Sequence, residues 1–132
     1  MMTRRKFFML DVLNLMEGNL RTSLDDENEK VHVFTHLSHF YGQGCSIYTT
    51  YAYRAGDNCE QTLSRWKKMK VSTSEIIVNN RGTISHQHGV GKDHAAYLAR
   101  EKGELAMSML KTLCRSVDDK GILNPGTLFV DD

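Results

Sequence analysis

Two neighbouring stretches of alternating polarity constrain the fold of this chain more than any other feature of its sequence. The first, VHVFTHL from residue 31, places valine, threonine and leucine on one face and histidine and phenylalanine on the other. The second, CSIYTTYAYR from residue 45, places Ser46, Tyr48 and Thr50 on a face of their own. A repeat of two residues is the period of a β-strand, and the glycines of the intervening SHFYGQG loop permit a turn. The two stretches therefore predict antiparallel strands over residues 31–37 and 45–54, with one polar face.

Apolar residues at helical spacing precede and follow these strands. Steps of three and four residues predict an amphipathic helix over residues 4–24, with a face formed by Leu10, Leu13, Met16, Leu20 and Leu24. A second long helix is expected to begin after Asp57, its N-cap, and to end before Gly82 in a left-handed conformation. Its buried stripe would consist of Cys59, Leu63, Trp66, Thr73 and Ile77.

The remainder of the chain predicts a short strand and two more helices. The strand is expected at residues 83–85, and the helices over roughly residues 93–102 and 104–117. The last helix would have a core face formed by Leu105, Met109, Leu113 and Val117. In the tail, the Asn124-Pro125-Gly126 sequence predicts a turn.

The order of these elements is helix, strand, strand, helix, strand, helix, helix. It indicates an α+β fold, with a small antiparallel sheet and helices on one face of it. The order is that of a ferredoxin-like domain without its leading strand, which leaves a sheet edge for another chain or segment to cover. Because the 132 residues contain no repeat and no linker, we expect a single domain, residues 1–132.

The composition is that of a globular protein and narrows the classes of function. With 40% hydrophobic residues, 25% charged residues and a net charge of +1, the chain has no strong field that favours nucleic acid. No run approaches the ~20 apolar residues of a membrane span. The start MMTRRKFFML is similar to a twin-arginine export signal, but Asp11, Asn14 and Glu17 interrupt the apolar stretch that such a signal requires. Three widely spaced cysteines fit reduced thiols, and we expect a cytoplasmic protein.

The segment GTISHQHGVGKDH, residues 82–94, combines three histidines with three glycines. It is not a P-loop, because His86 and Asp93 occupy the positions of an obligatory glycine and an obligatory hydroxyl residue. Two interpretations of its glycines stay open. They could expose backbone amides to an anion, with assistance from Lys92, or they could only turn the chain.

The same segment raises the question of a metal site. His86 and His88 would share one side of an extended backbone, and His36 and His39 could supply further imidazoles for zinc. No acidic residue lies within the His-x-His motif as a general base, and no cysteine lies at ligand spacing. Histidines also act as acid–base groups without metal. We therefore expect no dedicated metal site, and keep a metal-binding module as an alternative.

Three segments together resemble the C-terminal domain of FAD-linked oxidases of the vanillyl-alcohol-oxidase type. They are HLSHFYGQGCSIYTTYAYR (residues 36–54), GTISHQHGVGKDHAAYL (residues 82–98) and the closing DDKGILNPGTLF. Within this family the pattern is most similar to the alkyldihydroxyacetonephosphate synthase subgroup, which makes the ether bond of ether lipids. The resemblance covers nearly the whole chain from residue 32 onward. It implies FAD as the cofactor and a small-molecule substrate with or without a phosphate group.

The resemblance also implies roles for individual residues. In the subgroup, an acyl chain on a flavin-bound substrate is exchanged for a fatty alcohol, and a tyrosine and a histidine cluster handle the protons. These catalytic positions fall on Tyr48, His86 and His88. Residues near the substrate or the cofactor would be His39, Tyr41, Ser46, Thr50, Gln87 and Lys92. The position of Tyr48 beside small polar residues, outside the apolar stripe, would let its phenol reach a ligand.

Two departures from the family pattern limit what the resemblance implies. Gln87 stands where the ether-lipid enzymes have the middle of three histidines, and an amide cannot carry a proton near neutral pH. This leaves room for oxidation of a 2-hydroxy acid, such as lactate or glycolate, or of a glycerol phosphate. Nothing in the chain resembles the glycine-rich segment that holds the FAD pyrophosphate in this family. We therefore expect the flavin-binding domain to be absent from residues 1–132, and the chain alone to be inactive.

Three further expectations concern partners. An FAD-binding domain or subunit is implied by the resemblance, and no nucleic acid is expected. A homo-oligomer is one way to complete the sheet, since an incomplete sheet disfavours a lone monomer. A non-catalytic interaction subunit is the second alternative to an enzyme; its contact surface would be the sheet edge and the apolar face of the first helix.

Overall fold

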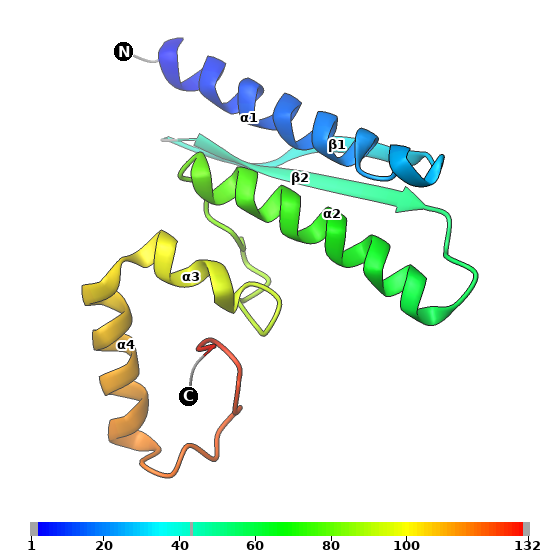
Figure 1. Cartoon of the computed structure of the whole chain (residues 1–132). Coiled ribbons are helices and arrows are strands. Elements are labelled where there is room, and N and C mark those ends of the chain that lie inside the picture. The colour runs from blue at the N-terminus through cyan, green and yellow to red at the C-terminus, as the bar shows by residue number, and fades with distance from the viewer. Residues whose placement is uncertain (1–2, 43, 131–132) are drawn as a thin grey trace. The chain divides into compact units, whose positions relative to one another are not determined.

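The computed structural model describes residues 3–42 and 44–130. These residues form two compact units, which divide between residues 80 and 81. The first unit contains α1 (Thr3–Thr22), a 3-10 turn (Asp25–Glu27), β1 (Val31–Tyr41), β2 (Gly44–Tyr53) and α2 (Cys59–Asn79) (Figure 1). The second unit contains α3 (Ala95–Lys102) and α4 (Glu104–Val117). The small antiparallel sheet and the four helices confirm the predicted α+β class.

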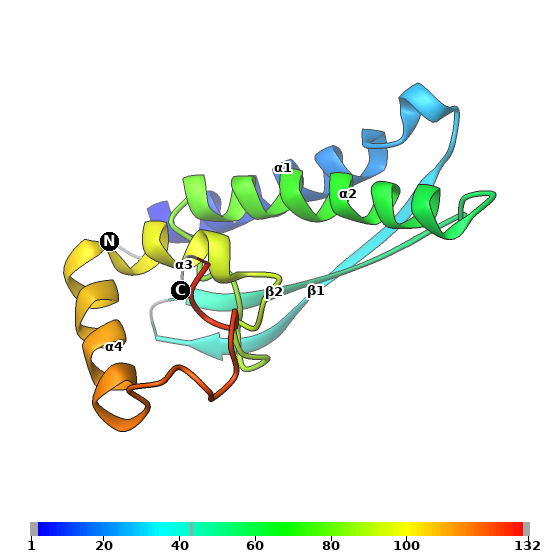
Figure 2. The same ribbon diagram turned by 60° about the horizontal axis from the view of Figure 1, so that its bottom comes forward.

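The core of the first unit lies between one face of the sheet and the two long helices. Figure 2 shows α1 and α2 on the same side of β1 and β2, and the core cluster draws on all of them except β2: Leu20, Leu24, Val31, Val33 and Met69. Tyr51 and Tyr53 of β2 pack against this cluster. Burial of each large apolar side chain contributes roughly 1.5–3 kcal/mol to folding. The predicted helix face is confirmed at Met16 and Leu20, whereas Leu10 is about half exposed. Leu24 is buried as expected, but α1 ends at Thr22, so Leu24 lies in the turn after the helix.

β1 extends further than the sequence indicated, whereas β2 has the predicted length and lies one residue earlier than expected. Residues 38–41, which were expected to form a loop, continue β1, and β2 starts at Gly44. The pairing places Val31 opposite Tyr53 and Tyr41 opposite Gly44, with an irregularity between Leu37 and His39. Ser38 is therefore the extra residue of a β-bulge. The bulge lets the strand pair continue past the point where the simple alternation ends.

Polar contacts fix α1 against its neighbours. The side-chain amide of Asn19 donates to the hydroxyls of Ser72 (2.9 Å) and Thr73 (3.0 Å) on α2. Arg21 donates to the backbone carbonyl of Val33 at 2.8 Å. Hydrogen bonding from the Thr35 hydroxyl, and then from Arg21, holds the pKa of Glu17 below its ordinary value. Apart from the pair of Arg21 with Glu17, which lies within α1, these contacts join α1 to α2 or to β1 and fix its position over the sheet.

Helix α2 differs from the prediction in its cap and in its buried stripe. The N-cap is Asn58 rather than Asp57, because the Asn58 side chain accepts a hydrogen bond from Gln61 N at 2.8 Å. Cys59 and Leu63 are exposed, and the residues that are buried on α2 are Arg65, Met69, Thr73 and Ser74. Of the predicted stripe, Thr73 is buried. The pattern of apolar residues could not identify the rest of the buried face, because that face includes the charged side chain of Arg65.

Arg65 is the buried polar centre of the first unit. Its Nε lies 2.8 Å from Glu27 Oε2, and one of its terminal nitrogens lies 3.8 Å from Glu29 Oε1. The other donates to the carbonyl of Arg54 at 2.8 Å and more weakly to that of Ala55. One guanidinium thus joins α2, the turn after α1 and the end of β2. This use of its donors explains how an arginine can be almost fully buried.

The second unit corrects three predictions. Residues 83–85 form no strand, because the backbone N–H of Ile84 donates to the Glu101 carboxylate instead of to a neighbouring strand. The left-handed residue after α2 is Arg81, with φ of 56°, rather than Gly82. The predicted bounds of α4 are confirmed, but its expected core face is exposed at Leu105 (77%), Met109 (66%), Leu113 (64%) and Val117 (77%).

The contacts of Arg65 predict a large effect of its removal. Arg65→Ala leaves Glu27 and two backbone carbonyls without their donor, and should lower the free energy of unfolding by about 2–4 kcal/mol. Urea denaturation followed by circular dichroism measures this change. The control is Lys68→Ala, which breaks an exposed ion pair with Asp26 and should change stability little. Equal effects of the two substitutions would contradict the central role of Arg65.

Candidate functional site

The outer face of the sheet, which points away from α1 and α2, is the candidate site of the first unit. Alternation along the two strands places exposed side chains on this face, among them those of His32, Phe34, His36 and Tyr48. Thr50 and Ala52 of β2 lie on the same face and are also exposed. Histidine, tyrosine and hydroxyl side chains lie on this face because most aliphatic side chains of the two strands point to the inner face. The face is polar and aromatic, as the sequence predicted.

The bulge at Ser38 determines which residues complete this face. His36 pairs with Tyr48, and after the bulge His39 pairs with Ser46 and Tyr41 with Gly44. A regular strand would place His36 and His39 on opposite faces, because they are three residues apart. The extra residue changes the phase of the alternation. His39, Tyr41, Ser46, Tyr48 and Thr50 therefore share one face, as the sequence-based hypothesis required.

Ring contacts organise the outer face, and two of them join a histidine to a tyrosine. The rings of His36 and Tyr48, from opposite strands, lie 5.1 Å apart between centroids and are tilted by 32°. The rings of His39 and Tyr41 are nearly parallel at 6.5 Å. Aromatic rings at such separations attract one another beyond their area burial, so each contact helps to hold an imidazole beside a phenol.

Hydroxyl groups join the two strands beside these rings. Ser38 Oγ lies 2.6 Å from Ser46 Oγ and 2.9 Å from His39 Nδ1. The chain of polar atoms thus runs from β2 across Ser38 to an exposed imidazole. Phenols, imidazoles and hydroxyls lie along the face, and such groups can exchange protons with a bound molecule.

The sequence hypothesis did not include His36 and Ser38 among the site residues. Both lie in the segment of residues 36–54 that carries the family resemblance, and the sequence suggests His36 only as a metal ligand. The signal that could have found His36 is its place on the strand: with antiparallel pairing in register, it falls directly opposite Tyr48. Ser38 gave no such signal, since a bulge cannot be read from the alternation of side chains alone.

The histidine-rich segment belongs to the second unit, and hydrogen bonds are formed near both of its ends. Ile84 is buried, and its N–H donates to Glu101 Oε2 of α3 at 2.9 Å. Burial raises the pKa of Glu101, but hydrogen bonds from Lys102 and from the Ile84 N–H outweigh burial, so that the pKa of Glu101 lies below its ordinary value. At the other end, His94 N donates to the Val90 carbonyl. Between these two points the segment turns at Gly89 and Gly91, which both have positive φ.

His86, Gln87, His88 and Lys92 are all exposed in this segment. Gln87 has φ of 56°, in the left-handed region that few residues other than glycine adopt. The backbone at Gln87 is therefore not extended, which corrects the assumption that placed His86 and His88 on one side of it. In the part of the chain that the structure describes, no three histidine, cysteine, aspartate or glutamate side chains form a group that could hold a metal ion.

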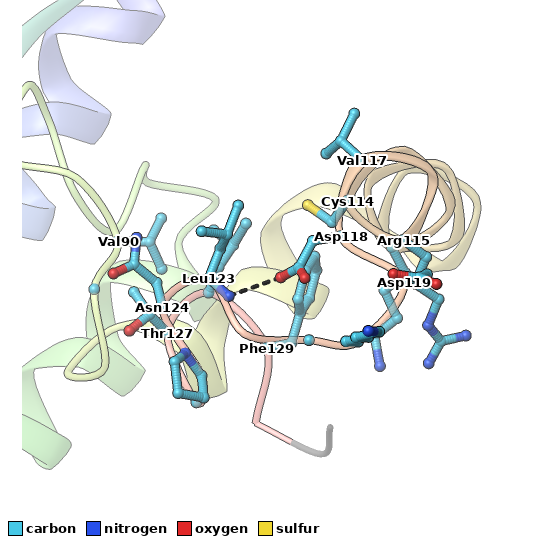
Figure 3. A pocket seen from close by; sticks show the side chains of 17 residues that line it. Val90, Cys114, Arg115, Val117, Asp118, Asp119, Leu123, Asn124, Thr127 and Phe129 are labelled. Carbon is cyan, nitrogen blue, oxygen red and sulfur yellow. Dashed lines mark hydrogen bonds between the residues drawn. The ribbon is translucent and has the colours of Figure 1, made fainter.

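A hollow of about 720 Å³ lies within the second unit, between the C-terminal part of α4 and the tail (Figure 3). Its apolar lining includes Cys114, Val117, Leu123 and Phe129. Asp118 holds the tail, because its carboxylate accepts hydrogen bonds from Ile122 N (3.1 Å) and Leu123 N (2.7 Å). Further along, Thr127 N donates to the Asn124 carbonyl, which confirms the predicted turn.

The cysteines and the long helices bear on two further expectations. None of the three cysteines is in a disulfide, and Cys59 and Cys114 are exposed. Among the residues with described positions, no helix is both long and apolar enough to cross a membrane.

The chain is similar to known proteins both at the level of a family and at the level of individual sequences. A family model described as "FAD linked oxidases, C-terminal domain" matches residues 10–128. The chain is 31% identical to the alkyldihydroxyacetonephosphate synthase of Trypanosoma brucei brucei over 94 residues, which are 71% of this chain and 15% of that protein. It is 27% identical to the enzyme of that name from Dictyostelium discoideum over 104 residues, 79% of this chain and 17% of that protein.

A third relative has a different name. The mitochondrial D-lactate dehydrogenase (cytochrome) 1 of Saccharomyces cerevisiae is 30% identical over 76 residues, which are 58% of this chain and 12% of that protein. The chain thus spans between 12% and 17% of the length of these three relatives. No solved structure matches it.

The link between Ile84 and Glu101 predicts how the histidine-rich segment responds to acid. Because the folded-state pKa of Glu101 is lowered, the stabilisation is present above the ordinary glutamate value and is lost as the pH falls through the lowered value. Protection of the Ile84 amide against hydrogen exchange, corrected for intrinsic rates and followed by NMR, should decline in this acidic range. In Glu101→Gln the protection should not depend on pH there.

The amide of Gly103, which donates to Ala99, is the internal control in both proteins. An identical acid response of Ile84 in the wild type and in Glu101→Gln would show that Glu101 does not anchor the segment.

Proposed function

Because the chain belongs to the family of FAD linked oxidases, C-terminal domain, we propose that it forms the substrate side of a flavin active site. The FAD would be held mainly by a flavin-binding part that is not among residues 1–132. The chain would act in an FAD-dependent oxidoreductase, or in a related enzyme that transfers an alkyl group. Residues 1–132 would form the cap part of that enzyme, the part that covers the substrate.

The observation that carries this proposal is the outer face of the sheet. It offers hydroxyls, phenols and imidazoles, and neither β1 nor β2 contains a lysine or an arginine. This donor set fits the region of a flavin site where a substrate gives up or receives protons. It does not fit the diphosphate of FAD, whose charge calls for backbone amides or basic side chains.

The proposed roles follow from the chemistry of each side chain. FAD, when bound, supplies the electron-accepting ring. Tyr48, with His36 beside it, would hold or donate a proton at its phenol oxygen, and the exposed imidazoles of His86 and His88 would act as acid–base groups. Residues that would orient the substrate by hydrogen bonding or charge are His39, Tyr41, Ser46, Thr50, Gln87 and Lys92.

Two substrate classes are compatible with these residues. The alkyldihydroxyacetonephosphate synthases among the relatives favour a phosphorylated three-carbon compound and a role in ether lipid synthesis. The D-lactate dehydrogenase and the amide of Gln87 favour a 2-hydroxy acid, since a glutamine cannot relay a proton. A glycerol phosphate combines features of both. An assay of one complete enzyme with each class decides between them.

The first functional prediction concerns flavin binding. The isolated chain should bind FAD weakly or not at all, because β1 and β2 offer no lysine or arginine to the charge of the diphosphate. Equilibrium dialysis of the purified 132-residue protein measures this. A fusion in which this chain replaces the matched segment of the Trypanosoma brucei relative should retain FAD and turn over substrate. Tight stoichiometric FAD in the isolated chain would overturn the division of roles.

The second functional prediction concerns Tyr48 and His88. In that fusion, Tyr48→Phe and His88→Ala should each lower turnover by roughly 100-fold, the scale expected for loss of an acid–base group. The matched control is Tyr51→Phe on the inner face of the same strand. Tyr51 packs against the core cluster, which places its phenol on the face opposite Tyr48, and burial raises the pKa of Tyr51. Unchanged turnover in Tyr48→Phe and His88→Ala would show that neither residue takes part in proton transfer.

A further inference from the structure

Helix α4 has an apolar face that its own unit does not cover. Leu105, Met109, Leu113 and Val117, here called the α4 stripe, follow one another at steps of four residues and are each at least 64% exposed. At 1.5 Å per residue the stripe is about 18 Å long. At about 100° per residue, the charged residues of α4 (Glu104, Lys111 and Arg115) lie on the opposite side of the helix. The stripe is thus a continuous uncharged surface.

The apolar surface continues beyond the helix. Val117 lies at the end of the stripe and lines the hollow beside the tail, together with Leu123. Ile122 and Leu123 are each 69% exposed. Single exposed apolar residues are common in proteins, but a contiguous apolar surface of several large side chains marks a place where another surface packs. We therefore infer that the apolar face of α4 packs against a surface that lies outside residues 81–132.

We propose that the α4 stripe is the surface on which the flavin-binding part of an FAD linked oxidase packs. This proposal rests on the proposed function and names where the partner binds. The length of the relatives supports the choice of partner, because about five sixths of the sequence of each lies outside the matched segment. A stripe without charge fits the apolar surface of a domain that is joined permanently, since obligate interfaces resemble a divided core.

The chain supplies cysteines that test this proposal. Cys114 follows Leu113 in α4, lines the hollow near Val117, and is exposed (Figure 3). Cys59 on α2 is exposed as well and belongs to the other unit. A third reporter is the thiol introduced by Met109→Cys, in the centre of the stripe. Rates of alkylation by N-ethylmaleimide are measured for each thiol by peptide mass spectrometry, in the isolated chain and in the fusion with the Trypanosoma brucei relative.

The proposal predicts selective protection. The thiol introduced by Met109→Cys and the thiol of Cys114 should react at least about tenfold more slowly in the fusion than in the isolated chain, because thiol reactivity follows exposure. Cys59 should react at a similar rate in both. Equal rates at the stripe in both proteins would overturn the proposal. Slow reaction at the stripe in the isolated chain would also overturn it, because a second copy or the chain's own first unit would then cover the surface.

A second variant separates docking from function. Met109→Gln combined with Leu113→Gln should leave the melting temperature of the isolated chain nearly unchanged, since both side chains are exposed there, and should lower that of the fusion. An equal effect in both proteins contradicts docking. FAD retention and turnover report on the proposed function instead. A fusion with a protected stripe but without FAD would support docking at the stripe and contradict the proposed function. A fusion that retains FAD and is active but has an unprotected stripe would support the proposed function and contradict docking at the stripe.

Discussion

Burial of one face of a two-stranded sheet is the constraint on which the rest of the first unit depends. The inner side chains of β1 and β2 pack with α1 and α2 around Leu20, Leu24 and Met69. The same alternation that sends apolar residues inward sends His36, Tyr48 and Thr50 outward. Arg65 then joins α2 to the turn after α1 and to the end of β2. The polar outer face is thus a direct consequence of how the core is built.

The candidate site depends on one irregularity in this regular pattern. The bulge at Ser38 changes the phase of β1, so that His39 and Tyr41 join His36 and Tyr48 on the outer face. Ser38 itself bridges Ser46 and His39 through its hydroxyl. A family whose members act on different substrates can change such a face by substitution without disturbing the core, because the two faces share only the backbone. The names of the relatives, which include an alkyldihydroxyacetonephosphate synthase and a lactate dehydrogenase, fit this separation.

Much of the fold, and part of the site, could be predicted from the sequence. Alternation identified both strands and their polar face, since burial on one side of a strand leaves a repeat of two residues in the sequence. The bounds of α4 were correct for a similar reason, but the sequence could not tell what its apolar face contacts, because amphipathicity records a need for burial and not the partner. The strand expected at residues 83–85 failed because Glu101, far along the chain, takes the Ile84 N–H. Arg65 was missed because only tertiary contacts make its burial favourable.

If the proposed function is right, the outer face of the sheet meets the flavin site in the complete enzyme. Hydroxyl-radical footprinting of the FAD-loaded fusion, compared with the isolated chain, measures this, because the modification of aromatic and large aliphatic side chains follows their exposure. Modification of Phe34 and Tyr48 should fall severalfold in the fusion, while that of Leu63, exposed on α2, should stay the same. Unchanged modification of Phe34 and Tyr48 in a fusion that retains FAD would show that the outer face does not meet the flavin site.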